Sequence, residues 1–160
     1  MNKKTIKTLL INIATPFGLA IFFLSDRILK TKALSLEASK ELITNLFFFN
    51  LTKNYFISFS LPLSGPILNI FIVLLIIILG IYLIFLIIRE KDRKLEIILL
   101  LFIFFGALSN LIDRLSLGFV VDYLELRYFT VFNLADVMIV IPSFWLILNN
   151  LDLNKKKLLK

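Results

Sequence analysis

The chain of 160 residues contains no cysteine and no histidine. These absences exclude disulfides, thiol nucleophiles, Ser-His-Asp triads and most of the usual zinc sites. Charged residues are also scarce, at 18% of the chain. Any chemistry must come from carboxylates, hydroxyls, Lys or Tyr, and we expect neither a metal nor a cofactor.

Apolar residues, in contrast, make up 59% of the chain, and the mean hydropathy is +0.95. A soluble domain of this length would carry more charge. Runs such as residues 66–88 reach the roughly 20 residues that a helix needs to cross a bilayer. We therefore predict an integral membrane protein forming one domain over residues 1–160, all-α with a small β element.

Four membrane spans are predicted from the apolar runs, at about residues 8–25, 66–88, 95–112 and 132–148. The first run could instead be a cleaved signal peptide, but its continuation past Ala20 favours a retained helix.

Basic residues predict the orientation of these spans. The two ends and the turn at 89–94 carry eleven Lys or Arg in 25 positions, whereas the connections 25–65 and 113–131 carry seven in 60. The positive-inside rule places both termini in the cytoplasm. Because the basic groups flank apolar runs, they indicate contact with membrane lipids and no nucleic-acid partner.

The first long connection has its own local pattern. Asp26 and Lys30 are four residues apart, which predicts an interfacial ion pair ending the first helix. Residues 35–43 could form a short amphipathic helix. Residues 46–49 and 55–61 are typical of strands, with a turn around Thr52 and Asn54.

Polar residues interrupt the apolar pattern between Gly106 and Asp136. Gly106, Asn110 and Arg114 recur every four residues and so share one helix face. They could be interhelical contacts, or they could serve a site. For Asp113 we expect a structural role, as the partner of Arg114 in an interfacial pair. Gly106 would let another backbone or a substrate approach closely.

The two acids Asp122 and Asp136 are the strongest candidates for chemistry. Alone, Asp136 fits helix capping together with Asn133, and Asp122 fits a solvated connection. The predicted topology nevertheless brings both acids to the outer face. Two carboxylates in one site share a proton near neutral pH, which provides a base for water and an acid for a leaving amine.

The segments GALSNLIDRLSLGFVVDYLEL (106–126) and VFNLAD (131–136) resemble the lipoprotein signal peptidase family, the signal peptidase II membrane aspartyl endopeptidases of bacteria. The resemblance implies that Asp122 and Asp136 are the catalytic pair. It also implies that Asn54, Asn110, Arg114 and Asn133 support the substrate or the pair. A small extracytoplasmic sheet, about 46–61 with 117–126, would cradle the substrate. Phe56 and Ser58 stand where the family has glycine and alanine.

The expected function is removal of signal peptides from diacylglyceryl-modified prolipoproteins by a monomeric, multi-pass protein of the bacterial cell membrane. Its active site would lie at the extracytoplasmic face. Two alternatives stay open: a small proton-coupled carrier that uses the same acids, and a non-catalytic relative that binds lipoprotein signal peptides.

Overall fold

The computed structural model describes residues 3–55, 65–90 and 93–158. They form a mostly helical fold with a small antiparallel sheet, which confirms that part of the predicted fold class. The helices are α1 (Lys3–Leu34), α2 (Pro66–Arg89), α3 (Lys94–Leu117) and α4 (Leu134–Leu158). The strands are β1 (Lys40–Ile43), β2 (Phe47–Asn54), β3 (Val120–Leu126) and β4 (Thr130–Phe132).

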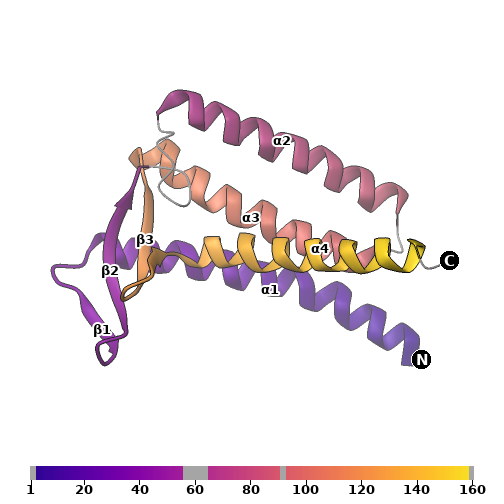
Figure 1. The fold of residues 1–160 in the computed structure, drawn as a ribbon, viewed down its shortest axis with the longest axis horizontal. Helices are drawn as coiled ribbons and strands as arrows, with labels where there is room; N and C mark the ends of the chain where they lie inside the picture. The colour runs from indigo at the N-terminus through magenta and orange to yellow at the C-terminus, as the bar shows by residue number, and fades with distance from the viewer. Residues whose placement is uncertain (1–2, 56–64, 91–92, 159–160) are drawn as a thin grey trace.

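The four helices lie side by side, and the sheet stands across one end of them (Figure 1). The beginning of α1 and the end of α4 lie at the opposite end. Helix α3 packs against both α2 and α4, and α1 packs against α3 and α4. This arrangement brings β3 and the first turn of α4 to the same end of the bundle.

Among the residues that the structure describes, two helices, α2 and α3, are long and apolar enough to cross a membrane, each with 24 residues. The apolar part of α4, Leu134–Asn149, is shorter. On α2 large side chains such as Ile70, Ile77 and Ile84 are more than half exposed. An apolar surface of this kind suits lipid rather than water, because in water it would favour aggregation.

Helix α1 continues past the point where we predicted its end. It runs to Leu34, so Asp26 and Lys30 lie inside the helix and not at its end. Both side chains are fully buried. The prediction failed because charged residues usually mark a helix end at the membrane surface, whereas here their partners come from α3.

The sheet has the order β1-β2-β3-β4, with every neighbouring pair antiparallel. Its central contact with the helices is a cluster of Ala33 at the end of α1 with Val121 and Tyr123 of β3. This cluster fixes β3 against α1, next to the polar residues of the bundle.

A β-bulge in β2 decides which of its side chains share a face with Asp122. Phe49 lies opposite Leu124 and Thr52 lies opposite Asp122, so Asn50 and Leu51 together face one residue of β3. Side chains alternate along a strand. Asn54, two residues after Thr52, therefore shares the face of Asp122.

Two local predictions for the first connection are wrong. Residues 40–43 form strand β1 and not part of a helix, because the segment pairs with β2. Thr52 and Asn54 lie within β2 and not in a turn, because the pairing with β3 continues through them. Pairing between segments overrides local propensity at both places. The strand predicted at 55–61 falls on residues outside the described ones, apart from Tyr55, which follows β2.

At Gly106, α3 and α4 approach each other closely. A Cβ atom added there would lie 2.6 Å from the carbonyl oxygen of Ala135 and 2.9 Å from the side chain of Ile139. The predicted close approach is therefore that of a backbone, namely the start of α4. This contact places Asp136 beside α3.

We expect Gly106→Ala to destabilise the fold by about 1–3 kcal/mol, because α3 and α4 must separate to admit the methyl group. Thermal unfolding in detergent micelles measures the loss. Gly18→Ala is the matched control, since nothing lies within 4 Å of a Cβ atom added there. A loss of equal size in both variants would contradict this role for Gly106.

Candidate active site

Strand β3 supplies Asp122 and the first turn of α4 supplies Asp136, and Asn133 joins them. The Asn133 side-chain amide donates to Asp122 Oδ1 at 2.7 Å, and its backbone N–H donates to Asp136 Oδ2 at 3.2 Å. Asn133 Oδ1 in turn accepts the backbone N–H of Asp136 at 2.8 Å. Asn133 is therefore both the N-cap of α4 and the link between the two carboxylates.

The other oxygen of each carboxylate also accepts a side-chain amide. Asn110 Nδ2 donates to Asp136 Oδ1 at 2.8 Å, and Asn54 Nδ2 donates to Asp122 Oδ2 at 2.9 Å. Three asparagines from β2, α3 and the start of α4 thus hold all four oxygens. The structure brings these five of the six predicted site residues into one hydrogen-bond network.

Burial and the neighbouring charge of Asp136 raise the pKa of Asp122 to about 7, against an ordinary value of 3.8. The hydrogen bonds from Asn54 and Asn133 and the charge of Lys30 act in the opposite direction. Asp122 therefore changes its protonation state near neutral pH, as one partner of an acid–base pair must.

A cavity of about 380 Å³ opens beside the pair. One end is polar, with Asn54, Asn110, Arg114 and Asp136. The rest is apolar, and it is lined by side chains from α2, α3, β3 and α4: Phe71, Ile72, Leu75, Ile76, Leu79, Ile103, Ala107, Val120 and Ile139. Asp122 is 2% exposed and is connected to this cavity through Asn54.

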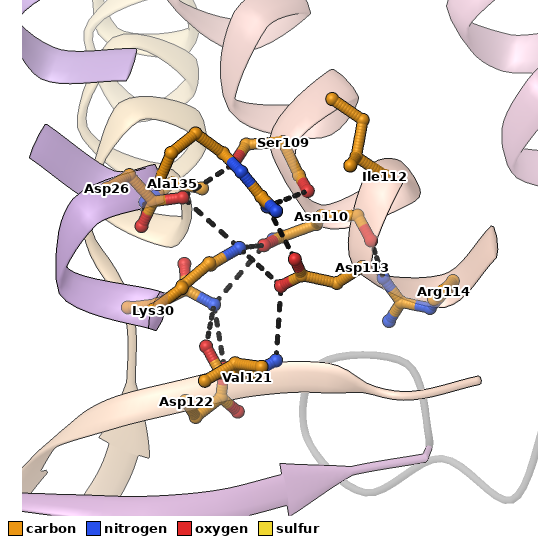
Figure 2. A network of polar contacts seen from close by, with 12 residues as sticks. Asp26, Lys30, Ser109, Asn110, Ile112, Asp113, Arg114, Val121, Asp122 and Ala135 are labelled. Atoms are coloured by element: carbon orange, nitrogen blue, oxygen red, sulfur yellow. Dashed lines mark hydrogen bonds and ion pairs between the residues drawn. The ribbon is translucent and has the colours of Figure 1, made fainter. Parts of the chain in front are cut away.

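Arg114, the sixth predicted residue, lies at the polar end of the cavity one turn after Asn110. Its Nη1 donates to the backbone carbonyl of Asn110 at 3.4 Å (Figure 2). The charge of Arg114 also interacts with those of Asp136 and Asp122. It therefore supplies a cation next to the space that a substrate would occupy.

Behind the carboxylates lies a buried cation, Lys30, which is 1% exposed. Its ammonium donates to Asp113 Oδ2 at 2.8 Å, to Asn110 Oδ1 at 2.8 Å and to Asp26 Oδ2 at 3.1 Å (Figure 2). An ammonium has three N–H donors, and all three are matched. The pair predicted between Asp26 and Lys30 exists, but in the interior of the bundle.

The bond from Lys30 sets the orientation of the Asn110 amide. Its oxygen accepts from the ammonium and from Asn133 Nδ2 at 3.2 Å, so its nitrogen must point to Asp136. A flipped amide would turn two N–H donors toward a cation. Lys30 thereby orients the amide group that donates to Asp136, although Lys30 itself makes no hydrogen bond to Asp136.

Asp26 on α1 holds the beginning of α4. Its Oδ1 accepts from the hydroxyl of Tyr123 at 3.0 Å and from the backbone N–H of Ala135 at 3.2 Å. The Tyr123 hydroxyl accepts the backbone N–H of Leu134 at 3.0 Å, and burial together with Asp26 raises the pKa of Tyr123. Distant side chains therefore satisfy backbone donors that the first turn of a helix leaves open.

Asp113 forms its ion pairs with α1, whereas the sequence predicted a pair with its neighbour Arg114. It forms ion pairs with Arg27 and Lys30 of α1, and it accepts the backbone N–H of Val121 at 3.2 Å. It therefore joins α1, α3 and β3. This agrees with the structural role that we expected for Asp113.

Comparison with known proteins identifies the family. Residues 19–151 match the family described as Signal peptidase (SPase) II. The chain belongs to this family. A solved bacterial membrane enzyme shares the fold, with a TM-score of 0.77 and 24% identity, and the match covers 90% of this chain and 91% of the other.

Two lipoprotein signal peptidases illustrate how far the similarity extends. The protein of Haemophilus influenzae is 34% identical over 146 residues, which is 86% of this chain and 85% of that protein. The protein of Pelotomaculum thermopropionicum is 53% identical over 55 residues, which is 32% of this chain and 36% of that protein. With this and three further relatives, the chain spans between 30% and 52% of the relative's length.

Sequence reasoning missed several residues of this candidate site. Lys30, Ser109 and Tyr123 each contact Asp26 within the buried network. Ser109 and Tyr123 look ordinary in the sequence. The signal that could have revealed Lys30 is its position in α1, because a lysine inside an apolar bundle must be paired with acids.

Lys30→Met should destabilise this family member by about 3–5 kcal/mol, because it leaves the buried carboxylates of Asp26 and Asp113 without their shared cation. Thermal unfolding in detergent micelles measures the effect. Lys32→Met on the same helix is the control, since Lys32 is exposed. Equal stability of the two variants would show that the buried cation is dispensable.

Proposed function

We propose that the chain is an aspartyl endopeptidase that removes signal peptides from lipid-modified bacterial prolipoproteins, cleaving before the diacylglyceryl cysteine. The observation that carries this proposal is the sharing of one network by Asp122 and Asp136 at the polar end of an apolar cavity. Membership of the signal peptidase II family supports the same substrate class.

The two carboxyls supply both proton transfers that peptide hydrolysis needs. One carboxylate takes a proton from water while the water oxygen bonds to the scissile carbonyl carbon. The other carboxyl then gives its proton to the amide nitrogen as the C–N bond breaks. The pair starts and ends with one proton, and the products are a carboxylic acid and the amine of the cysteine.

The residues around the pair divide into two roles. Asn133, Asn110 and Asn54 orient the carboxylates, because each donates directly to one of them. Arg114 and Asn54 face the cavity, where they can contact the peptide. The charge of Arg114 suits the negative charge that develops on the carbonyl oxygen during attack.

The same proposal includes the placement in the membrane. Four spans with both termini in the cytoplasm agree with the distribution of Lys and Arg. They put the sheet and the carboxylates at the extracytoplasmic face of the bacterial cell membrane. The apolar walls from α2, α3 and α4 suit an apolar signal peptide and lipid acyl chains. One chain supplies both carboxylates and the asparagines that hold them, which favours a monomer.

Asp122→Asn and Asp136→Asn should each lower cleavage of a synthetic diacylglyceryl peptide by about 1,000-fold or more, because one proton transfer is lost. Thermal unfolding should show that both variants remain folded. Glu37→Gln, which removes an exposed acid, should keep full activity. Cleavage retained in either aspartate variant would refute the catalytic pair.

The rate of cleavage should fall as pH rises through about 7, because Asp122, whose pKa lies near that value, then loses the proton that the pair needs. The profile of kcat/KM against pH, with a loss approaching about tenfold per unit on the alkaline side, measures this.

Asn54→Ala provides the comparison for this profile. The hydrogen bond from Asn54 lowers the pKa of Asp122, so its removal should move the alkaline limb to higher pH. If the alkaline limb lies at the same pH in the unmodified protein and in Asn54→Ala, a group other than Asp122 determines that limb.

A further inference from the structure

Two tight turns lie side by side at one end of the sheet. The turn between β1 and β2 and the turn between β3 and β4 are joined by Arg127. Its backbone N–H donates to the carbonyl of Leu46 at 2.9 Å, and its Nη1 donates to Asn45 Oδ1 at 3.0 Å. We call this region the paired-turn tip; its exposed apolar side chains are Leu42, Ile43, Leu46, Tyr128 and Phe129.

The two aromatic residues of the paired-turn tip are almost completely exposed. Tyr128 is 93% exposed and Phe129 is 80% exposed. Burial of an aromatic side chain is a large source of stability. The fold gains little stability from these two rings, although both residues follow a well-packed strand.

The backbone conformation of Tyr128 also shows that this residue adds little stability to the fold. Its φ is 68°, in the left-handed region, which is unfavourable for a bulky side chain. Asn45 occupies the same region in the adjoining turn with a φ of 55°, and Asn tolerates it well. A tyrosine at this position costs conformational energy, and its contact with Arg127 leaves the ring almost completely exposed, so the ring is available for a contact outside the described fold.

The position of the paired-turn tip indicates what that contact is. The sheet packs on the last turns of α1 through Ala33, and the tip projects past the bundle on the side away from α2 (Figure 1). Helix α1 has 32 residues, more than the roughly 20 that cross a bilayer. Its last turns therefore stand at the membrane surface, and the tip lies beside them at that level.

The chemistry of the paired-turn tip fits the interfacial layer of a lipid bilayer. Tyr and other amphipathic aromatic residues collect at the headgroup level. The Arg127 guanidinium lies 5.4 Å from the ring of Tyr128 and 5.8 Å from the ring of Phe48. A cation held among aromatic rings can meet lipid phosphates while the rings enter the upper acyl region.

We infer that the paired-turn tip inserts Tyr128 and Phe129 into the outer leaflet and holds the free end of the sheet on the lipid surface. This rests on the membrane placement proposed above and is independent of the peptidase activity. The contact sets the height of β2 and β3, and thus of Asn54 and Asp122, relative to the lipids from which a lipid-modified substrate arrives.

Tryptophan fluorescence of the full chain in phosphatidylethanolamine–phosphatidylglycerol vesicles tests the inference. Trp145→Phe removes the native tryptophan, and Tyr128→Trp then places one reporter in the tip. Lipids brominated near either end of their acyl chains measure its depth. We expect this reporter to lose more emission to bromines near the glycerol than to those near the chain ends. Phe129→Trp is the second reporter in case the first variant does not fold.

Ala38→Trp in the same background is the matched control. Residue 38 is exposed and belongs to the connection between α1 and β1, which extends farthest from the bundle (Figure 1). Its emission should stay red-shifted and insensitive to bromine. The inference fails if the tip reporters behave like this control. It also fails if their emission is blue-shifted but insensitive to bromine, because a second copy or another protein would then cover the tip. Loss of peptidase activity in a reporter variant would change neither the expected emission wavelength nor the expected quenching by bromine.

Discussion

The buried ammonium of Lys30 is the interaction on which the rest of the site depends. It joins α1 to α3 through Asp113 and Asn110, and it completes the environment of Asp26, which in turn holds the first turn of α4. A buried ion pair adds little stability by itself, but removal of one partner is costly. The helices are therefore held in one arrangement, with the orientation of the Asn110 amide defined by that arrangement.

The proposed catalytic pair depends on this arrangement because its members come from different elements. Asp122 belongs to a strand that packs on α1, whereas Asp136 belongs to a helix that contacts α3 at Gly106. Asn133 links the two only when β3 and the start of α4 are both in place. Two acids are thereby kept close in a largely buried site, and burial with mutual repulsion makes one of them retain a proton near neutral pH.

Much of the helical fold could be predicted from the sequence, because long apolar runs such as that of α2 leave few alternatives in a membrane. The end of α1 could not, since Asp26 and Lys30 find partners 80 or more residues away. The motif around Asp122 and Asp136 indicated the candidate pair. Local patterns failed for β1 and for Thr52 because their conformation is decided by pairing between strands.

The bulge in β2 restricts how chains with this site can vary in length. Loss of Asn50 or Leu51 would leave one residue opposite Tyr123 and keep Thr52 opposite Asp122. Because strand faces alternate with every residue, one residue gained between Thr52 and Lys53 would instead turn Asn54 away from Asp122 and present Lys53 in its place. An insertion in the turn between β1 and β2 leaves that alternation unchanged. A gained residue is therefore compatible with the site at the outer end of the hairpin, and incompatible with it directly before Asn54.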